Sequence, residues 1–587
     1  MRSMLKRNET LIKKKLWQYL IPSIMTNMAM QIGNVVDTIL VGNILGKEAM
    51  SSVQIGSTVL LLIQIPGYML GIGGCIVAAI RMGKRDIDGA SGVFGGCLFA
   101  AAASGMAMMI CAFFSNPIAR MLTGGEGVLT GDVSSVIRVM FLGAPLLGIA
   151  LVFLNFMEVD NHPKLTTMYV VVSNVINLLS DFLLLKYTSI GPAGSVLSTL
   201  IGYGAAMIVV IFYFRSPKRM LHLKLSFKAL STALLTGIPA LLMIACQVVR
   251  NWLMNIMIIR YAGEDGTAIY TICLNLIMIV ELFLGGIIEV MSKVGGVVYG
   301  EKDYFGLRSL SKNILKYSYI VLVGLMILLF IFAKQAAAIF GRDDPMLLEE
   351  AQPAIRIFIF ALPFYVFCRF FSAYYQTTEK ARLSNMIIVL ELVVLLIPSV
   401  LVALNLASSN GTSAINATMA GMVVAEMLTV IVTTVVVKLT GKGQGMLRIP
   451  SGEEDVLDVS VGRNMAEVSA IPRDIISFCE GKLDPIRANQ LAVAAEEMAA
   501  NAVTYGGEGL SSIDVMLSFQ DDKVLLRLRD NGIPFDPTDY SLDGGEFEFS
   551  GIELVRGLAD DITYLRVLDF NNTTLEFSKG TISEGVS

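Results

Sequence analysis

Charged residues are scarce in this sequence: Asp, Glu, Lys and Arg make up 16% of its 587 residues, whereas hydrophobic residues make up 54%. This composition excludes a soluble globular protein of this length and predicts an integral membrane protein. Histidine occurs only as His162 and His222, so the chain after residue 440 cannot autophosphorylate on a histidine. No Gly-x-x-x-x-Gly-Lys-Ser/Thr motif occurs, which leaves a P-loop ATP pump without support.

The seven cysteines show neither the spacing of a metal site nor a disulfide pattern. Six of them lie in apolar segments, where a thiol behaves as a small hydrophobic side chain. No signal-peptide cleavage pattern precedes the first apolar segment, and Leu16–Gly42 is too long for the core of a signal peptide. We therefore expect an uncleaved first membrane helix.

Long apolar segments follow one another up to about residue 440, and about 20 apolar residues are enough for a helix to cross a bilayer. The pattern predicts about twelve spans, at residues 16–42, 53–80, 91–114, 134–157, 166–187, 192–214, 230–259, 267–295, 312–333, 351–377, 384–406 and 412–438. The sequence thus predicts a polytopic α-helical membrane protein with a mixed α/β tail. The expected domains are two six-helix lobes, a linker and the tail, at residues 1–225, 226–440, 441–455 and 456–587.

Lysine and arginine are concentrated in alternate loops. The basic set comprises the N-terminus and four loops, at residues 1–15, 81–85, 215–228, 302–308 and 380–382. The remaining loops hold single basic residues, and loops rich in Lys and Arg stay in the cytoplasm. We therefore expect a multi-pass protein of the plasma membrane with both termini in the cytoplasm.

An internal repeat relates the two halves of the apolar region. Met82–Asp86 (MGKRD) follows the second predicted span, and Tyr299–Asp303 (YGEKD) follows the eighth, 217 residues later. Such a repeat predicts two similar bundles around an axis normal to the membrane. The same offset carries Asp37 onto Met254, so the second half lacks this carboxylate, which argues against a purely structural role for Asp37.

Two carboxylates lie inside apolar segments of the first half. Asp37 falls within the first span, and Asn177 and Asp181 lie four residues apart on one face of the fifth, followed by Thr199 in the sixth. A carboxylate in hydrocarbon costs about 2.5–3.5 kcal/mol on insertion scales, so these residues are candidates for a Na⁺ or proton site. The alternatives are that Asp37 reaches interfacial water, and that Asn177 and Asp181 are hydrogen-bonding contacts between helices.

Further polar residues lie in spans of the second half. Gln247, Arg250, Glu281 and Glu391 are the candidates for a polar substrate pathway. The alternative is packing of Glu–Arg pairs inside the bundle, which intramembrane charges commonly adopt.

These motifs resemble those of multidrug and toxic compound extrusion (MATE) transporters over roughly residues 10–440. The resemblance rests on NVVDTILVG around Asp37, the two Gly-x-x-Asp turns, Asn177-x-x-x-Asp181, and GPAGSVLST ending at Thr199. It implies a two-lobed antiporter driven by Na⁺ or H⁺, with membrane lipids and a small-molecule substrate as partners. The family's cation site matches Asp37, Asn177, Asp181 and Thr199. Some branches also use an acidic residue in the seventh helix, where this sequence offers Gln247, Arg250 and Asn251 instead.

Three features of the tail carry chemistry. Glu497 and Asn501 lie one helical turn apart, where the amide oxygen suits Mg²⁺ and the carboxylate can orient a hydroxyl. Asp530 and Gly532 follow a predicted strand, so that an acceptor stands beside a residue that lets a flat base approach. Gly544, Gly545 and Gly551 lie ahead of a helix that is predicted in the segment SGIELVRGLADDI, and the N-terminus of this helix suits a phosphate. The ordinary alternatives are a solvated helix face, a turn and a flexible loop.

In this order the three features resemble the GHKL (Bergerat) ATP-binding α/β sandwich, specifically its anti-sigma-factor kinase branch, over about residues 456–580. AEEMAANAVTYG, DNGIPFDP and SGIELVRGLAD match the family's three boxes. The resemblance implies ATP with Mg²⁺ as cofactor, Glu497 as the base, Asn501 on Mg²⁺, Asp530 and Gly532 at adenine, and Gly551 in the phosphate loop. Phe549 departs from the family pattern, because it occupies the first glycine position of the third box.

Taken together, the sequence predicts a cation-coupled antiporter that exports drug-like or organic solutes, with an ATP-binding regulatory domain. The first alternative is a membrane sensor whose tail is a Ser/Thr kinase acting on a cytoplasmic regulatory protein. The second is a flippase for lipid-linked precursors. Neither the sequence nor the resemblance gives a role to nucleic acid.

Overall fold

The computed structural model describes residues 5–45, 47–123, 128–341, 345–410, 413–441, 444–449, 456–520, 522–539 and 550–579. Side chains of some residues inside helices, among them residues 34–43, lie outside this description. The chain forms two compact units. The membrane unit comprises residues 16–442, and the tail unit comprises residues 443–587 together with residues 1–15.

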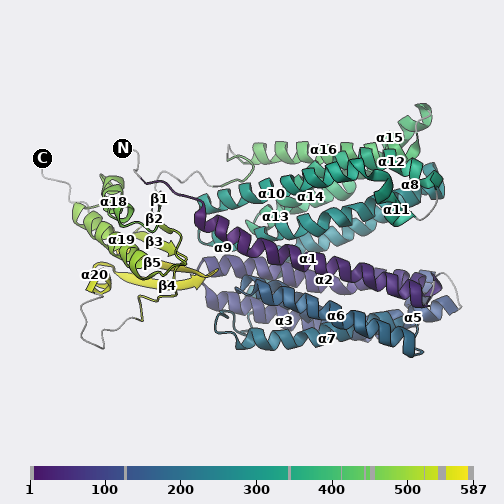
Figure 1. The fold of residues 1–587 in the computed structure, drawn as a ribbon, viewed down its shortest axis with the longest axis horizontal. Coiled ribbons are helices and arrows are strands. Elements are labelled where there is room, and N and C mark those ends of the chain that lie inside the picture. Colours follow the sequence, from purple (N-terminus) through teal and green to yellow (C-terminus); the bar gives the residue numbers. More distant parts are fainter. Residues whose placement is uncertain are drawn as a thin grey trace. The chain divides into compact units, whose positions relative to one another are not determined.

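Long helices make up the described membrane unit (Figure 1). The first half contains α1 (Thr10–Leu45), α2 (Lys47–Gly83), α3 (Ile87–Met109), α4 (Ser115–Thr123), α5 (Val128–Val159), α6 (Pro163–Tyr187) and α7 (Ala193–Arg215). The second half contains α8 (Phe227–Val290), α9 (Gly296–Gly300), α10 (Tyr304–Ile331), α11 (Ala333–Gly341), α12 (Pro345–Phe358), α13 (Leu362–Thr377), α14 (Ala381–Val389), α15 (Leu396–Asn410) and α16 (Ala414–Thr440). Figure 1 shows the two halves as two groups of helices, one purple to blue and one teal to green.

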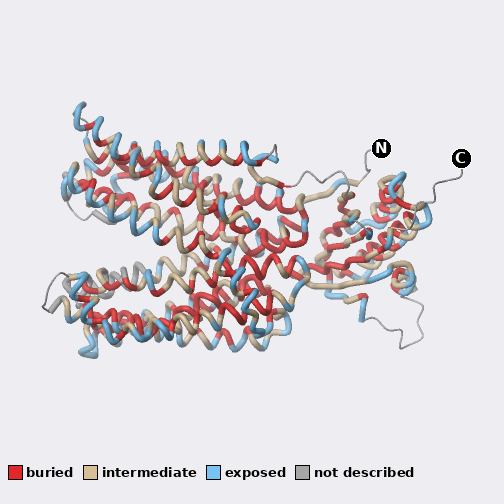
Figure 2. Tube along the Cα trace, turned by 180° about the vertical axis from the view of Figure 1, so that it is seen from behind, coloured by how far each residue is buried: buried red, intermediate tan, exposed pale blue. Residues whose placement is uncertain are grey.

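Eleven helical segments of the described chain are long and apolar enough to cross a membrane, from Val59–Gly83 to Ala414–Thr440. Gly263, with a φ of 68°, interrupts α8 and divides it into two of these segments. The 36-residue helix α1 accompanies them, with part of its apolar stretch outside the described side chains. Many large hydrophobic side chains face outward, such as Phe113 and Met121 at 88% exposure, as expected of surfaces that meet lipid. Buried residues gather where helices pack against one another (Figure 2).

The two Gly-x-x-Asp turns have the same geometry. In each, the aspartate Oδ1 accepts a hydrogen bond from the backbone N–H three residues later, at 2.7 Å for both Asp86 and Asp303. Each aspartate thereby caps the helix that follows, α3 or α10. The residue before it is left-handed in both turns, with φ 64° at Arg85 and 58° at Lys302. The sequence repeat therefore corresponds to a repeated structure.

The repeats also meet at equivalent glycines. A Cβ on Gly83 would collide with the carbonyl oxygen of Val297, and a Cβ on Gly300 would collide with the carbonyl oxygen of Ile80. Glycine lets the two backbones approach as closely as they do here. Because Gly83 and Gly300 are related by the repeat offset, the pseudo-twofold axis between the halves passes between them.

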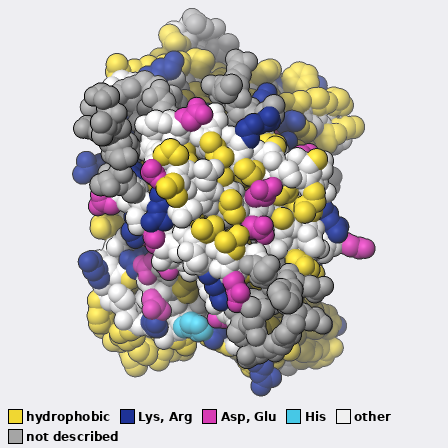
Figure 3. All heavy atoms as spheres, turned by 90° about the vertical axis from the view of Figure 1, so that its left-hand side faces the viewer, with side chains coloured by type: hydrophobic (Ala, Val, Ile, Leu, Met, Phe, Trp, Pro, Cys, Tyr) yellow, Lys and Arg dark blue, Asp and Glu magenta, His cyan; other side chains and the backbone are white. Residues whose placement is uncertain are grey.

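The tail unit contains a five-stranded antiparallel sheet with strand order β1-β2-β3-β5-β4. Its strands are β1 (Val456–Val461), β2 (Ile513–Phe519), β3 (Lys523–Asp530), β4 (Asp561–Val567) and β5 (Phe570–Ser578). Its helices are α17 (Met465–Val468), α18 (Ile471–Cys479), α19 (Pro485–Tyr505) and α20 (Ser550–Leu558). Figure 3 shows acidic, basic and hydrophobic side chains interspersed on the face that it draws.

One hydrophobic core joins α19 to the sheet. Leu491 and Ala495 of α19 belong to the same buried cluster as Val515 of β2 and Leu526 of β3. Asp484 accepts hydrogen bonds from two N–H groups of the first turn and so fixes where α19 begins. The core therefore fixes the helix face that carries Glu497 and Asn501 relative to the strand that ends at Asp530.

The tail differs from the prediction at one place. The segment SGIELVRGLADDI was predicted to be helical throughout, but α20 ends at Leu558 and β4 begins at Asp561. Ile562 and Tyr564 pair with Leu575 and Thr573 of β5. Apolar and aromatic residues alternating along β4 satisfy this pairing, which overrides the helical pattern.

Candidate cation site and nucleotide pocket

Asp181 is the centre of a polar cluster between α6 and α7. Its side chain is fully buried and accepts a hydrogen bond from Ser198. The Asn177 amide donates to the hydroxyls of Ser198 at 3.1 Å and Thr199 at 3.2 Å. The structure thus brings together three of the four predicted cation-site residues. It adds Ser198, the residue before Thr199 in the GPAGSVLST motif, to which the motif alone gives no role.

Close packing of α6 and α7 creates this cluster. A Cβ on Gly202 would collide with the carbonyl oxygen of Ser173, so glycine permits the approach of the two helices. The hydroxyl of Thr199 also donates to the carbonyl oxygen of Ser195, at 3.0 Å. One carboxylate, two hydroxyls and an amide therefore converge inside a membrane span, and this donor set suits Na⁺ or a proton.

Asp37, the fourth predicted residue, lies in α1, but its side chain is outside the described ones. The described part of α1 runs along α6 before that point. The hydroxyls of Thr26 and Thr167 are 2.9 Å apart, and Asn174 donates to the carbonyl oxygen of Ala29 at 2.5 Å. Helix α1 therefore packs against the helix that carries Asp181.

The polar residues of the second half fall into two groups. Glu281 is held by Arg369, whose Nε lies 3.2 Å from its Oε1, and by the hydroxyl of Tyr365. For Glu281 the structure therefore shows the paired packing that was the alternative to a substrate role. Gln247 is exposed on α8.

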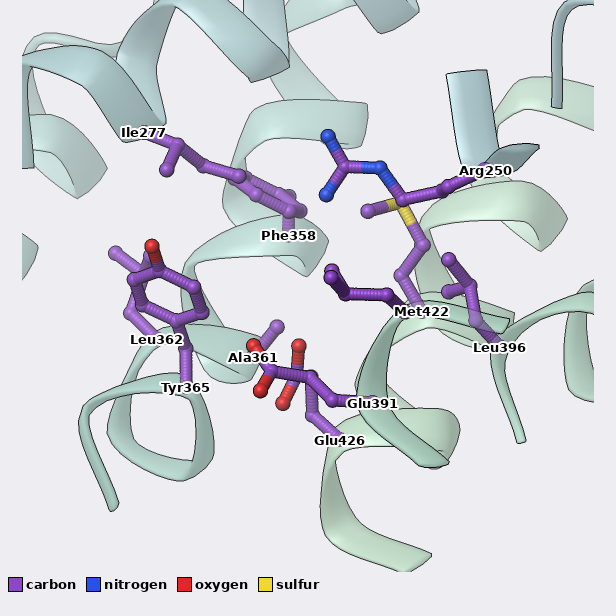
Figure 4. Close-up of a pocket in the computed structure, with 11 residues that line it drawn as sticks. Arg250, Ile277, Phe358, Ala361, Leu362, Tyr365, Glu391, Leu396, Met422 and Glu426 are labelled. Carbon is purple, nitrogen blue, oxygen red and sulfur yellow. The ribbon is translucent and has the colours of Figure 1, made fainter. Parts of the chain in front are cut away.

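Arg250 and Glu391 line a cavity of about 30 Å³. Figure 4 shows the Arg250 guanidinium at one end and the carboxylates of Glu391 and Glu426 at the other. Glu391 lies in a π-helical turn, Leu390–Val394, and is 6% exposed. Such turns widen a helix locally and are frequent at functional sites. A volume of this size holds about one water molecule.

The nucleotide-pocket residues of the tail converge from α19 and α20. A Cβ on Gly551 would collide with Oε2 of Glu497, and Nδ2 of Asn501 would lie 3.8 Å away. The third box therefore sits against the first. The Asn501 Nδ2 atom is buried and has no hydrogen-bond partner among the described residues.

Asp530 and Gly532 form the second part of the pocket. Oδ1 of Asp530 accepts hydrogen bonds from the N–H of Gly532 and from Nδ2 of Asn571, both at 2.8 Å. Burial raises the pKa of Asp530, and these two hydrogen bonds oppose that shift. A Cβ on Gly532 would lie 2.9 Å from the backbone of Gly506 at the end of α19, so this position accepts only glycine without rearrangement.

These residues fit ATP with Mg²⁺. The buried Nδ2 of Asn501 has no hydrogen-bond partner among the described residues, and the Oδ1 of the same amide is the atom that would hold the metal. Asp530 offers a fixed acceptor for an amino group, while Gly532 packs closely on Gly506 and Gly551 packs closely on Glu497, where a Cβ would collide. Phe549, Gly544 and Gly545 lie outside the described residues.

Comparison with known proteins agrees with both units. The family model MatE matches residues 22–183 and 239–402, and the model of a histidine kinase-like ATPase domain matches residues 463–579. Multidrug export protein MepA of Staphylococcus saprophyticus is 22% identical over 339 residues, which cover 56% of this chain and 74% of MepA. MepA of Staphylococcus aureus strain MRSA252 is 21% identical over 390 residues, which cover 65% of this chain and 85% of MepA.

Solved structures give the same fold. A MOP superfamily transporter from Pyrococcus furiosus has a TM-score of 0.68 at 20% identity, covering 74% of this chain and 96% of that chain. An outward-facing multidrug resistance MATE family transporter also has a TM-score of 0.68 at 20% identity, covering 73% and 95%. At this identity the likeness shows the fold alone.

The fold and the comparisons define a multi-pass membrane transporter fused to an ATPase-like domain. The chain belongs to the MatE family, and its C-terminal domain is histidine kinase-like. The predicted fold class, a MATE-like helical bundle followed by a GHKL domain, is confirmed.

Proposed function

We propose that this protein is a cation-coupled antiporter that exports drug-like or organic solutes, driven by H⁺ or Na⁺. The observation that carries the proposal is the buried Asp181, which is surrounded by hydroxyl and amide groups inside a membrane span. A carboxylate in hydrocarbon is costly, and a proton or a cation that comes and goes gives it a function there. Both relatives described above are named as multidrug exporters.

The register of α1 against α6 supports Asp37 as the second carboxylate of this site. The helices contact each other at Thr26 and Thr167, and again where a Cβ on Gly33 would meet Asn174. Both pairs are 141 residues apart in sequence, so the two helices run in parallel. If this register continues for one more turn, Asp37 would lie level with the Asn177–Asp181 face of α6, which supports the proposal. Two carboxylates at one level could share one cation or one proton.

Arg250 and Glu391 are proposed to lie along the solute path, with Gln247 at its exposed edge. Their cavity of about 30 Å³ is too small for an organic solute, so transport requires the surrounding helices to separate. Glu281 would stabilise the lobe, because Arg369 and Tyr365 already engage it. With Arg250 facing two carboxylates, the described cavity does not favour an anionic lipid-linked substrate.

The tail is proposed to bind ATP and regulate transport from the cytoplasm. Asn501 would hold Mg²⁺, Asp530 would accept a hydrogen bond from the adenine amino group, and Gly551 would leave room for the phosphates. Mg·ATP would supply a transferable phosphoryl group when bound. No motif of a P-loop pump occurs, so ion re-entry drives export and the nucleotide modulates it.

A Ser/Thr kinase activity of the tail is the second candidate. The observation that favours it is Glu497, which lies beside Gly551 and one helical turn from Asn501, where a base could accept a hydroxyl proton. The test is phosphoryl transfer from labelled ATP to cytosolic proteins by the full chain and by Glu497→Ala. Labelling that is unchanged by this substitution contradicts the kinase candidate.

The test of the antiporter is dye efflux from proteoliposomes under separate Na⁺ and pH gradients, with and without internal ATP. We expect efflux with one of the gradients, and we expect Asp181→Asn and Asp37→Asn to abolish it. Asp88→Asn is the matched control, because Asp88, in the first turn of α3, is 83% exposed and pairs with Lys224. Ion-driven efflux by Asp181→Asn equal to that of the unmodified protein rejects the site.

A further inference from the structure

The N-terminal segment before α1 is an integral part of the tail unit. Arg7 lies 2.9 Å from Asp458 of β1 and 2.8 Å from Asp514 of β2, and its side chain is 5% exposed. The Asn8 amide donates to Ser512 at 3.1 Å, and Leu5 packs against the core of the tail unit. A buried arginine shared by two carboxylates is costly to displace, so this segment is fixed to the sheet (Figure 1).

The same segment leads into the first membrane helix without a break. Asn8 Oδ1 accepts a hydrogen bond from the N–H of Thr10 at 2.9 Å, and α1 then runs continuously from Thr10 to Leu45. The residues up to Lys15 belong to the tail unit and those from Leu16 belong to the membrane unit. One helix therefore begins on the ATPase-like domain and carries Asp37.

The first turns of α1 touch the nucleotide pocket through Gly509. Nζ of Lys14 donates to the carbonyl oxygen of Gly509 at 3.1 Å, and Nδ2 of Asn531 donates to the same oxygen at 2.6 Å. Asn531 stands between the two predicted adenine contacts, Asp530 and Gly532. A change in the position of this loop is therefore transmitted to Lys14 through one shared acceptor.

Lys15 provides a second connection, to the turn between β4 and β5. It is 2% exposed, with Nζ 3.8 Å from Oδ2 of Asp569 and 5.0 Å from the centre of the Phe570 ring. Asn571, two residues beyond Asp569, is the side chain that donates to Asp530. The loop at Gly509 and the turn between β4 and β5 therefore each connect the start of α1 to residues of the nucleotide pocket.

The turn that meets Lys15 is itself strained. Val567 pairs with Phe570, so Leu568 and Asp569 form a two-residue turn, with φ 53° and 58°. Turns of this kind favour Asn and Gly, and a leucine in the left-handed region is strained. Such strain persists only where surrounding contacts enforce it, which points to the docked segment as part of the functional structure.

We propose that residues 5–15 are the coupling element through which nucleotide bound in the tail regulates the transporter. Nucleotide at Asp530 and Gly532 tightens the loop and the β4–β5 turn that hold Lys14 and Lys15, and so restrains the start of α1. The transport consequence rests on the proposed antiporter function, whereas the effect on α1 does not.

The test uses the full-length protein in lipid nanodiscs, with Mg·AMP-PNP as the probe and amide hydrogen exchange of residues 10–20 as the readout. In the unmodified protein we expect these amides to exchange several-fold more slowly when the probe is bound. In Lys14→Ala/Lys15→Met we expect this difference to vanish. By thermodynamic reciprocity, the double variant should bind the probe more weakly than the unmodified protein, by the factor by which the probe slows exchange in the unmodified protein.

Lys13→Ala is the matched control, because Lys13 pairs with Glu9, the residue just before α1, at 2.7 Å. It should respond to the probe as the unmodified protein does. Protection of the buried Cys479 thiol from labelling shows that each variant keeps the tail folded.

Exchange of residues 10–20 that is unchanged by bound probe overturns the inference, as does a full response in the double variant. Failure of the unmodified protein to bind the probe overturns it as well. Nucleotide-dependent exchange in a protein that shows no ion-driven efflux would support the coupling element while rejecting the antiporter.

Discussion

Replacing Arg7 should destabilise the tail unit even though Arg7 lies more than 400 residues from its partners in sequence. Arg7→Ala leaves Asp514, whose side chain is 3% exposed, without its cation. Removing one partner of a buried ion pair typically costs about 3–5 kcal/mol. Ser460 continues to donate to Asp514 at 2.7 Å, which favours the lower end of this range.

The assay is labelling of Cys479 with a thiol reagent in increasing urea, with the other cysteines replaced. Cys479 is 1% exposed, and burial raises the pKa of its thiol to about 11, so it reacts only when the tail opens. A loss of 3–5 kcal/mol raises the open population about 100- to 4,000-fold, since each 1.4 kcal/mol is a factor of ten. The labelling rate should rise accordingly wherever reclosing outpaces labelling.

Two variants decide what the result means. Lys6→Ala removes the neighbouring exposed cation and should label at the rate of the parent. Arg7→Met combined with Asp458→Asn and Asp514→Asn removes the charges together and should recover much of the loss. A labelling rate for Arg7→Ala equal to that of Lys6→Ala would refute the docking of the N-terminal segment.

Three further predictions concern the repeat axis and the nucleotide pocket. Gly300→Val should lower the unfolding midpoint of the purified protein, because overpacking costs about 1–3 kcal/mol of stability. Gly324→Val should leave the midpoint unchanged, because the space around Gly324 is open. Equal midpoints for the two variants would contradict the proposed axis. Because burial raises the pKa of Asp530, affinity for AMP-PNP should fall on acidification at a pH above the usual carboxyl value of about 4, as the proton removes the charged acceptor; an affinity that falls only near that usual value contradicts this. The same raised pKa means that the folded tail loses stability as Asp530 ionises, when the pH rises from the usual carboxyl value of about 4 through the raised pKa. Asn501→Ala should weaken AMP-PNP binding in Mg²⁺ more than in EDTA, and an equal loss in both would remove Asn501 from the metal.

Local sequence patterns predicted most of the helices. Hydropathy predicted the spans because each membrane helix satisfies its own backbone hydrogen bonds. The length and apolarity of a segment are therefore enough to predict a membrane helix, without knowledge of the neighbouring helices. The turns at Asp86 and Asp303 were predictable for the same reason, since a cap acts on the helix that follows it. Strand β4 was missed, because only its pairing with β5 distinguishes it from a continuation of α20.

In the candidate sites too, contacts within one helix could be predicted from the sequence, and contacts between helices could not. Asn177 and Asp181 are one helical turn apart, so their shared face follows from the helix alone. Ser198 becomes a partner of Asp181 only when α7 packs on α6. Glu281 and Glu391 look alike in sequence, yet one is paired with Arg369 and the other faces a cavity.

The sequence by itself determined that the chain enters a membrane many times, repeats its first half, and ends in an ATPase-like domain. These properties depend on composition, on the internal repeat and on short motifs, all of which can be recognised from residues that are close together in the sequence. Only the tertiary structure decided that Arg7 belongs to the sheet of the tail, that Lys14 contacts the loop at Gly509, and that Lys15 contacts the turn between β4 and β5. Ion pairs form between residues that the fold brings together, and nothing local to a basic N-terminus specifies carboxylates more than 400 residues away.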